Sequence, residues 1–167
     1  RYGQYGYENY FMAYALYPEL IEKLFRLEGD YAALYNEAMA EAFIDAGLPL
    51  YCRLDHDMAD GSGTLVSLRS LEKLWLPHFE RAIAPLVRAG FKLLWHSDGN
   101  LMGLYPYLVE CGVNGFQGFQ YEYGMDYPKI CAMKSRDGAD PIIIAGVSVT
   151  RTLPFGTPED VKNEMRF

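Results

Sequence analysis

The chain has 167 residues, half of them hydrophobic, and a formal net charge of -7 at pH 7. This composition supports a sizeable hydrophobic core and excludes a disordered chain. The acidic balance and the lack of a Lys/Arg cluster argue against nucleic acid, whose binding depends on neutralising phosphates. No apolar run is long enough for a membrane helix, so we expect a cytoplasmic protein that binds neither nucleic acid nor membranes.

The two ends suggest a piece of a longer protein. The sequence begins at Arg1 without a Met and stops at Phe167, inside a helix that has only just started. We therefore expect residues 1–167 to form a single, truncated domain. Cys52, Cys111 and Cys131 are far apart in the sequence and never form a C-x-x-C pair, so we expect reduced thiols.

The first third of the chain is predicted to be mainly helical. Residues 1–17 fit one short helix, and Pro18 is expected to start a long amphipathic one. Gly29 is predicted to interrupt that helix and Gly47 to end it. A short strand is expected at residues 50–54.

The segment 55–63 is polar and too long for a tight turn, and we expect a loop there. From Ser67 or Ser70 to Ala89 the pattern is helical, with Pro77 separating the first turns from the main body. Gly90 ends this helix.

Strands and helices then alternate to the end of the chain. The expected elements are a strand ending at His96, a helix from about Tyr105 to Cys111, a strand at 115–119, a helix at 127–134, a strand at 141–146, a loop at 147–156 and a helix capped by Thr157. Such alternation predicts βαβ units with parallel strands adjacent in sequence order. We expect the polar residues after the strands to share one edge of this sheet, where α/β enzymes carry their active sites: Asp55, Asp57, His96, Asp98, Glu122, Asp126, Ser148 and Thr150.

The stretch from Phe91 to Asn100 is the most informative. An apolar run stops abruptly and is followed by His96, Ser97, Asp98, Gly99 and Asn100. Residues two apart on a strand point the same way, so His96 and Asp98 can converge on a metal or a substrate oxygen. The alternative is a structural His and Asp that cap the next helix.

Other common sites have no support in the sequence. There is no G-x-G-x-x-G after a strand and no P-loop, so nucleotide binding is not indicated. There is also no G-x-S-x-G nucleophile elbow.

Several phrases together resemble the uroporphyrinogen decarboxylase superfamily, which includes methylcobamide:coenzyme M and other corrinoid-linked methyltransferases. They are Trp95-His96-Ser97-Asp98-Gly99-Asn100, Glu110-Cys111-Gly112-Val113-Asn114-Gly115-Phe116-Gln117, Gly124-Met125-Asp126, Ile142-Ile143-Ile144-Ala145-Gly146 and Gly156-Thr157-Pro158-Glu159-Asp160-Val161. Their order and spacing carry the resemblance, which runs from about Pro18 to the end.

The resemblance implies a (β/α)8 TIM barrel, present here only in part as about four βα units. It also implies a methyltransferase with methylcobamide as methyl donor, a small-molecule substrate and a corrinoid protein as partner. In that branch a strand ends in H-x-C-G, whose His and Cys bind zinc. His96 matches that His, whereas Asp98 stands in place of the Cys. A carboxylate can bind zinc or another divalent metal, but it makes the site less thiophilic.

Two alternatives stay open at this point. A decarboxylase of porphyrin biosynthesis would need Arg residues for a polycarboxylate, and only Arg53 and Arg151 lie near expected strand ends. A repurposed barrel that binds a ligand or a corrinoid protein without catalysis is the second alternative.

The expected roles follow from position and chemistry. His96, Asp98 and Glu122 are the expected catalytic residues and metal ligands. Asp55 and His56 could complete the site from the preceding unit. The expected substrate-binding residues are Asp57, Asn100, Ser148 and Arg151. Against these stand simpler readings: His56 as a solvated loop residue, Asp126 as a helix N-cap and Asn100 as a turn residue.

A half-barrel would leave strand edges and helix faces uncovered. We therefore expect the isolated 167 residues to aggregate or to form a homodimer. A sharp two-state melt of a monomer would contradict this expectation.

Overall fold

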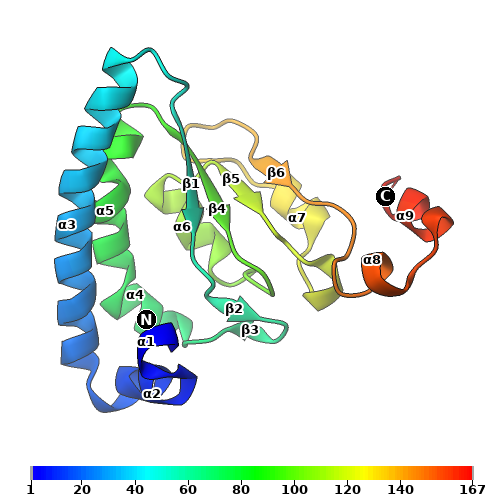
Figure 1. Cartoon of the computed structure of the whole chain (residues 1–167), viewed down its shortest axis with the longest axis horizontal. Coiled ribbons are helices and arrows are strands. Elements are labelled where there is room, and N and C mark those ends of the chain that lie inside the picture. Colours follow the sequence, from blue (N-terminus) through cyan, green and yellow to red (C-terminus); the bar gives the residue numbers. More distant parts are fainter. Residues whose placement is uncertain (1, 167) are drawn as a thin grey trace.

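The computed structural model describes residues 2–166 and shows a mixed α/β fold around one parallel sheet (Figure 1). The sheet consists of β1 (Tyr51–Asp55), β4 (Lys92–His96), β5 (Gly115–Gln117) and β6 (Ile142–Ile144). These strands are neighbours in this same order, and each pair is parallel. The predicted parallel order is therefore confirmed. The four strands form an open sheet, so the described residues do not show a closed barrel.

A small hairpin lies between β1 and the following helix, where the sequence predicted only a loop. Its strands are β2 (Ala59–Asp60) and β3 (Gly63–Thr64), which pair antiparallel. The Asp60 carboxylate accepts hydrogen bonds from the backbone N–H and the hydroxyl of Ser62, at 2.7 and 2.6 Å. Gly63 has a φ of 144°. An Asx-type turn of this kind is local, and it explains why so short a polar segment can fold back on itself.

The N-terminal region consists of α1 (Tyr2–Tyr5), α2 (Tyr7–Leu16) and α3 (Pro18–Asp45). The break predicted at Gly29 is wrong, because α3 is one continuous helix of 28 residues. Gly29 serves packing instead: a Cβ at this position would lie 2.8 Å from the carbonyl oxygen of His78. The glycine thus lets α3 approach its neighbouring helix closely, which sequence periodicity alone could not reveal.

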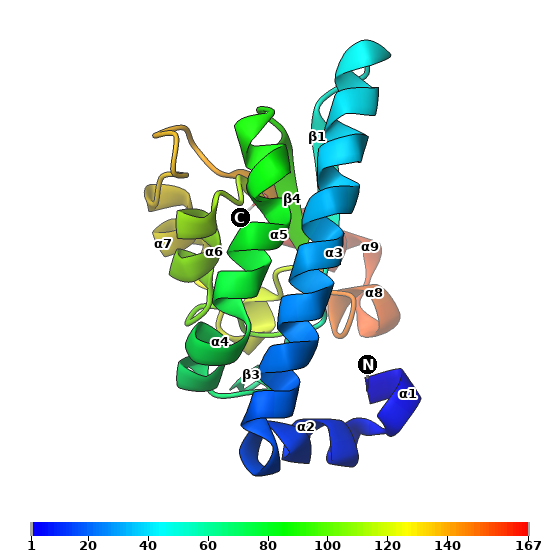
Figure 2. The same ribbon diagram turned by 90° about the vertical axis from the view of Figure 1, so that its left-hand side faces the viewer.

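The helix that Gly29 approaches is the second of two consecutive helices that the sequence predicted correctly. Ser67 caps α4 (Leu68–Leu74), and Pro77 lies in the first turn of α5 (Leu76–Arg88). Helices α3 and α5 run side by side along their length (Figures 1 and 2). They form the outer layer beside β1.

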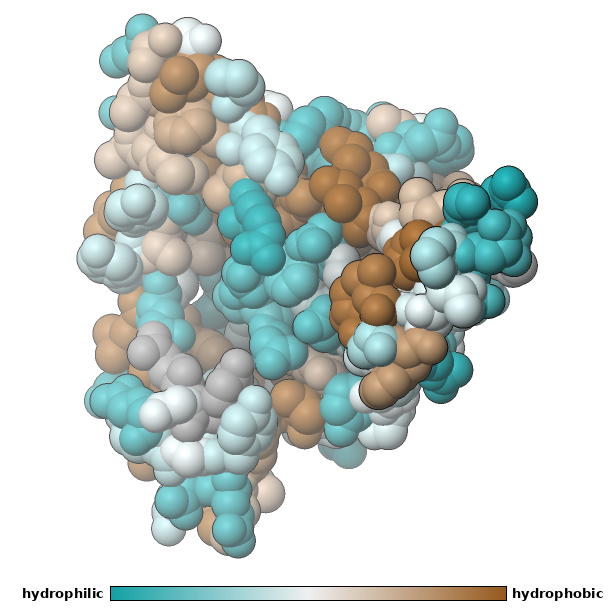
Figure 3. Space-filling view, turned by 45° about the vertical axis from the view of Figure 1, so that its right-hand side comes forward, coloured by the Kyte–Doolittle hydropathy of each residue, from teal (hydrophilic) through white to brown (hydrophobic). Residues whose placement is uncertain are grey.

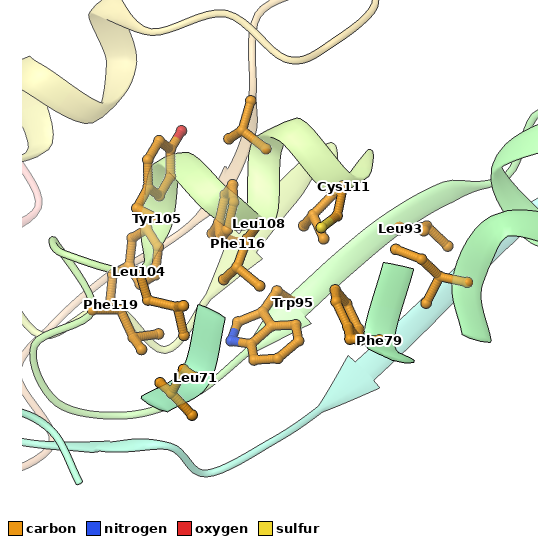
Figure 4. Close-up of a cluster of buried hydrophobic side chains, with 14 of the residues drawn as sticks. Leu71, Phe79, Leu93, Trp95, Leu104, Tyr105, Leu108, Cys111, Phe116 and Phe119 are labelled. Carbon is orange, nitrogen blue, oxygen red and sulfur yellow. The ribbon is translucent and has the colours of Figure 1, made fainter. Parts of the chain in front are cut away.

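One face of the sheet carries the main core. On β4, Leu93 and Trp95 are fully buried, and Trp95 is in register with Phe116 of β5. Helices α5 and α6 (Tyr105–Cys111) contribute buried side chains to the same cluster. Figure 4 shows Trp95 within it, together with Phe79 and Leu71. Removing these side chains from water is the main stabilising contribution to the fold.

The opposite face of the sheet is largely uncovered. Strand alternation directs His96 and Gln117 there, together with Arg53 of β1. Ile142 and Ile144 of β6 are 43% and 49% exposed. Figure 3 shows hydrophilic side chains across the middle of this view and hydrophobic ones gathered to their right.

The C-terminal part is the least buried. It contains the 3-10 turn η1 (Tyr121–Tyr123), α7 (Tyr127–Ala132), α8 (Thr152–Phe155) and α9 (Pro158–Glu164). Helix α8 was not predicted, whereas the predicted cap of α9 is confirmed as a capping box between Thr157 and Asp160. Among the described residues, no helix is both long and apolar enough to cross a membrane.

We predict that Gly29→Ala destabilises the protein even though alanine favours helices. The added methyl would push against the His78 carbonyl, so α3 and α5 would have to separate. We expect a loss of about 1–3 kcal/mol in the free energy of unfolding, measured by urea titration. Gly3→Ala is the control, because a Cβ there would meet no atom within 4 Å. Equal or greater stability of Gly29→Ala would contradict the packing argument.

Candidate functional site

Parallel register brings four chain segments to the same end of the sheet. Asp55 is paired with His96, His96 with Gln117, and Gln117 with Ile144. These are the last residues of their strands, so they form one row at the carboxyl edge. The sequence prediction that polar groups gather at this edge is confirmed for Asp55 and His96.

A cavity of about 450 Å³ opens next to this row. It lies between the ends of β4, β5 and β6, and it is lined by His96, Asp98, Gln117, Gly118, Phe119, Gln120, Glu122, residues 144–147, Ser148 and Val149. The three expected catalytic residues and Ser148 thus share one cavity. Its volume is within the range of small-molecule sites.

Two residues of the cavity lining each have a buried polar atom with no hydrogen-bond partner among the described residues. The atoms are Nδ1 of His96 and Oε1 of Gln117. Gly118 leaves room for the imidazole, because a Cβ there would lie 2.9 Å from Nδ1 of His96. Buried polar groups are normally hydrogen-bonded, so these atoms set His96 and Gln117 apart from Gln120 and Glu122, whose side chains are hydrogen-bonded within the protein.

The turn after β4 is held from two sides. Gly99 has a φ of 77°, and its N–H donates to Oε1 of Gln120 at 2.8 Å. The N–H of Asn100 donates to the carbonyl of Asp60 in the hairpin, also at 2.8 Å. The Asn100 side chain accepts a bond from the N–H of Met102. Asn100 therefore acts as a turn residue and lies outside the cavity lining.

Glu122 is fixed by hydroxyl groups from the loop after β6. Its Oε1 accepts hydrogen bonds from the hydroxyls of Ser148 and Thr150, the latter at 2.6 Å. Burial raises the pKa of Glu122, but the bonds from Ser148 and Thr150 outweigh it, and the pKa lies below its ordinary value. Glu122 is thus held as a carboxylate, which makes it a better electrostatic or structural group than a general acid.

The remaining expected residues lie elsewhere. Arg151 is exposed, and its backbone N–H donates to the Ser148 hydroxyl at 3.1 Å. Asp126 caps α7 by accepting a bond from the N–H of Lys129, as the simpler reading held. Asp55 is paired with Arg53 at 2.7 Å. Asp57 lines a different cavity, on the helix side of β1.

His56 also turns toward the helix side. Its ring stacks on Trp95, with centroids 4.8 Å apart, and meets Trp75 and Phe79 edge-on. These apolar surroundings lower the pKa of His56, and the Asp55 carboxylate opposes the shift only in part. His56 is an exposed loop residue, as the simpler reading held, and its ring also packs against the aromatic cluster while one side of it lines a cavity.

The expected set of three metal ligands is not assembled. Within residues 2–166, no three His, Cys, Asp or Glu side chains lie close enough together to hold one metal ion. His96, Asp98 and Glu122 line the same cavity but do not form a coordination sphere in this arrangement.

Sequence reasoning overlooked Gln117 and Gln120. Gln117 closes a strand whose motif had been noticed, yet it received no role because the register with His96 was unknown. Gln120 lies in a loop, and nothing in its sequence context indicates that it holds the Gly99 turn. Parallel alignment of the strand ends could have found Gln117, whereas Gln120 has no comparable signal.

Fold and site together define a mixed α/β protein with a polar cavity at the carboxyl edge of a parallel sheet. No protein-family model matches the chain, and neither the curated proteins nor the solved structures include a significant match.

We predict that His56 titrates below 6.5, its ordinary pKa, because desolvation of the ring by its apolar neighbours disfavours the charged form. As the pH falls, His56 is protonated in the unfolded chain before it is protonated in the folded protein. The free energy of unfolding therefore decreases below about pH 6.5, and this decrease ends once the pH is below the lowered pKa of His56 in the folded protein. NMR titration of the ring protons measures the value directly. Asp55→Asn should lower the pKa of His56 further, since it removes the opposing charge, and a His56 pKa of 6.5 or more would contradict the prediction.

We also predict that Ser148→Ala combined with Thr150→Val raises the pKa of Glu122, because both hydroxyl donors are lost while the burial remains. In the parent protein this carboxylate contributes stability above its unfolded pKa of about 4.5, and the contribution disappears as the pH falls through the lowered folded value. Carbon NMR of the Glu122 carboxyl group measures its pKa in the parent protein and in the double variant. Thr157→Val is the control, because that hydroxyl bonds to Asp160 instead.

Proposed function

We propose that this chain is part of a (β/α)8 barrel of the uroporphyrinogen decarboxylase type and works as a corrinoid-linked methyltransferase. Three features support the barrel: parallel strands in chain order, helices on one face, and an open face that carries Ile142 and Ile144. In a closed barrel the open face becomes the packed interior. The carboxyl edge then becomes the mouth where the active site lies.

The observation that carries the proposal is that His96, Asp98 and Gln117 line one cavity at the carboxyl edge of the sheet. Asp98 is exposed there, and the side chains of His96 and Gln117 each keep a buried polar atom that has no partner among the described residues. A ring nitrogen of His96 can accept a proton or bind a metal, whereas the amide group of Gln117 can hydrogen-bond a substrate. This is a suitable arrangement for an acceptor molecule that carries a thiol or hydroxyl group.

In the proposed reaction, a bound methylcobamide would supply the methyl group to the sulfur or oxygen of the acceptor, and its cobalt–carbon bond would break with the electron pair left on cobalt as Co(I). The acceptor loses its proton as the new bond forms, and His96 takes up that proton. Asp98 faces the same cavity and stabilises the resulting imidazolium by its charge. The carboxylate of Glu122, held by Ser148 and Thr150, borders the site and keeps the loop after β6 in place.

A zinc or other divalent ion would be held by His96 and Asp98, but these two do not complete a site. The other donors would come from outside residues 2–166, since no third ligand is close enough within them. Such an ion would lower the pKa of a bound thiol or hydroxyl group. The assignment of His96 as proton acceptor does not depend on it.

The electrostatics favour this function over decarboxylation of a polyanionic porphyrinogen. The lining of the cavity includes the carboxylates of Asp98 and Glu122 and no Lys or Arg among the described residues. Of the two Arg residues expected near strand ends, Arg53 is already paired with Asp55, and the charge of Arg151 acts on Glu122. A substrate with many carboxylates would meet like charges there.

The test mixes the full-length protein with a methylated corrinoid and an acceptor. The absorbance change as the methyl group leaves the corrinoid measures the rate. We expect His96→Ala to lower the rate by about 10²-fold or more, because a general base is lost. Asp98→Asn should weaken activity less and shift the pH profile. Asp140→Asn is the matched control, since Asp140 is exposed and pairs with Lys134 on the surface. Metal content is measured for each variant.

Parent-like activity in both His96→Ala and Asp98→Asn would refute the site assignment. Binding of the corrinoid with no turnover in the parent, across thiol and hydroxyl acceptors, would favour the alternative of a non-catalytic binding barrel.

A further inference from the structure

Asp98 lines the cavity at His96 from a turn that its own side chain does not fix. Asp98 is exposed, so packing around its carboxylate does not decide where that group lies. Its position depends instead on the backbone that carries it. The peptide unit between Asp98 and Gly99 is the decisive one, because a peptide unit is planar and turns as a whole.

Ser97 holds one end of this peptide unit. It is fully buried, and its hydroxyl donates to the carbonyl of Asp98 at 3.1 Å. The same hydroxyl accepts a bond from the N–H of Met58 at 3.3 Å, while the N–H of Ser97 donates to the carbonyl of Gln117 at 3.4 Å. Ser97 is therefore anchored to two neighbouring segments, and it fixes the oxygen of the peptide unit.

Gln120 holds the other end. The N–H of Gly99, which belongs to the same peptide unit, donates to Oε1 of Gln120 at 2.8 Å. Gly99 has no side chain that could replace this support, and a Cβ there would clash with the carbonyl oxygen of Asp60. Glycine permits many backbone conformations, so without Gln120 the peptide unit would be held by Ser97 alone and could turn more freely.

The backbone of Gln120 is itself fixed. Gln120 lies in the loop after β5, where its carbonyl accepts the N–H of Tyr123 at 3.0 Å as η1 begins. Its side chain crosses from this loop to the turn after β4, and it lines the same cavity as Asp98 and Glu122. It thus connects the wall that contains Asp98 with the wall that contains Glu122.

We propose that Gln120 is a positioning residue for Asp98 in the site at His96. Its oxygen fixes the N–H end of the peptide unit that carries Asp98, and the orientation of this unit directs the Asp98 carboxylate into the cavity. The inference rests on the proposed function, in which that carboxylate stabilises the imidazolium of His96. Gln120 then acts on the reaction through Asp98.

The effect of losing this bond should stay local. The N–H of Asn100 donates to the carbonyl of Asp60 at 2.8 Å, and Oδ1 of Asn100 accepts the N–H of Met102 at 3.0 Å. These bonds fix the chain after Gly99 without Gln120. We therefore expect variants of Gln120 to fold and to differ from the parent mainly at Asp98 and Gly99.

The first experiment measures hydrogen exchange of the Gly99 N–H by NMR in the full-length protein. Gln120→Met keeps the length of the side chain but removes the oxygen, so exchange should be about fivefold faster or more, as for one lost hydrogen bond. Gln120→Glu keeps an oxygen that can accept the bond, and it should exchange like the parent. Gln4→Met is the matched control, because Gln4 is exposed on α1 and lies outside the cavity.

The second experiment measures methyl transfer from a methylated corrinoid in a double-mutant cycle. Gln120→Met alone should lower the rate by about tenfold, because a misplaced group loses much of its effect. In the Asp98→Asn background the same substitution should change the rate by less than about twofold, since the group that it positions is already lost. Gln120→Glu should be closer to the parent than Gln120→Met.

Three results would overturn the inference: parent-like exchange of the Gly99 N–H in Gln120→Met, equally fast exchange in Gln120→Glu and Gln120→Met, or effects of Gln120→Met and Asp98→Asn that multiply independently. Parent-like methyl transfer in Gln120→Met beside impaired Asp98→Asn would also overturn it and would leave the proposed function intact. A parent protein that transfers no methyl group would refute the proposed function, whereas exchange of the Gly99 N–H would still decide whether Gln120 holds the turn.

Discussion

The position of Trp95 is the constraint on which the rest of the structure depends. Trp95 is fully buried among Phe79, Trp75 and the ring of His56, so β4 has only one register that satisfies it. Since side chains alternate along a strand, burying Trp95 on the helix side places its neighbour His96 on the opposite side. A slip by one residue would reverse both, so the same packing that builds the core also presents the imidazole to the cavity.

Much of the fold could be predicted from the sequence, because its signals are local. Pro77, Ser67 and Thr157 mark helix starts through backbone chemistry that operates within one turn, and short apolar runs mark the strands. The errors arose where distant contacts decide. Gly29 reads as a helix breaker in isolation, yet its lack of a side chain allows the close approach of α5. The hairpin at Asp60 depends partly on Asn100, forty residues away in the sequence.

The candidate site was predictable in outline but not in detail, for the same reason. Strand alternation correctly grouped His96 with Asp98, and the loops after β5 and β6 correctly brought Glu122 and Ser148 to the same cavity. The role of Glu122 could not be foreseen, because the hydroxyl donors that fix it come from residues 26 and 28 positions later. Likewise, the packing of the exposed His56 ring on Trp95 could not be foreseen, because its aromatic neighbours come from later segments of the chain.

The strand pairs of the sheet differ in length, and this difference decides which part of the sheet unfolds locally first. Strands β1 and β4 share a five-residue register, whereas β5 and β6 share three, and two residues of β6 are exposed on the uncovered face. Local opening starts where few apolar contacts hold the backbone. Amide protons of β6 should thus exchange with solvent before those of β4. The wall of the cavity at Ile144 is then the part able to move as a molecule enters, while the walls at His96 and at the hydrogen-bonded Ser148 stay fixed.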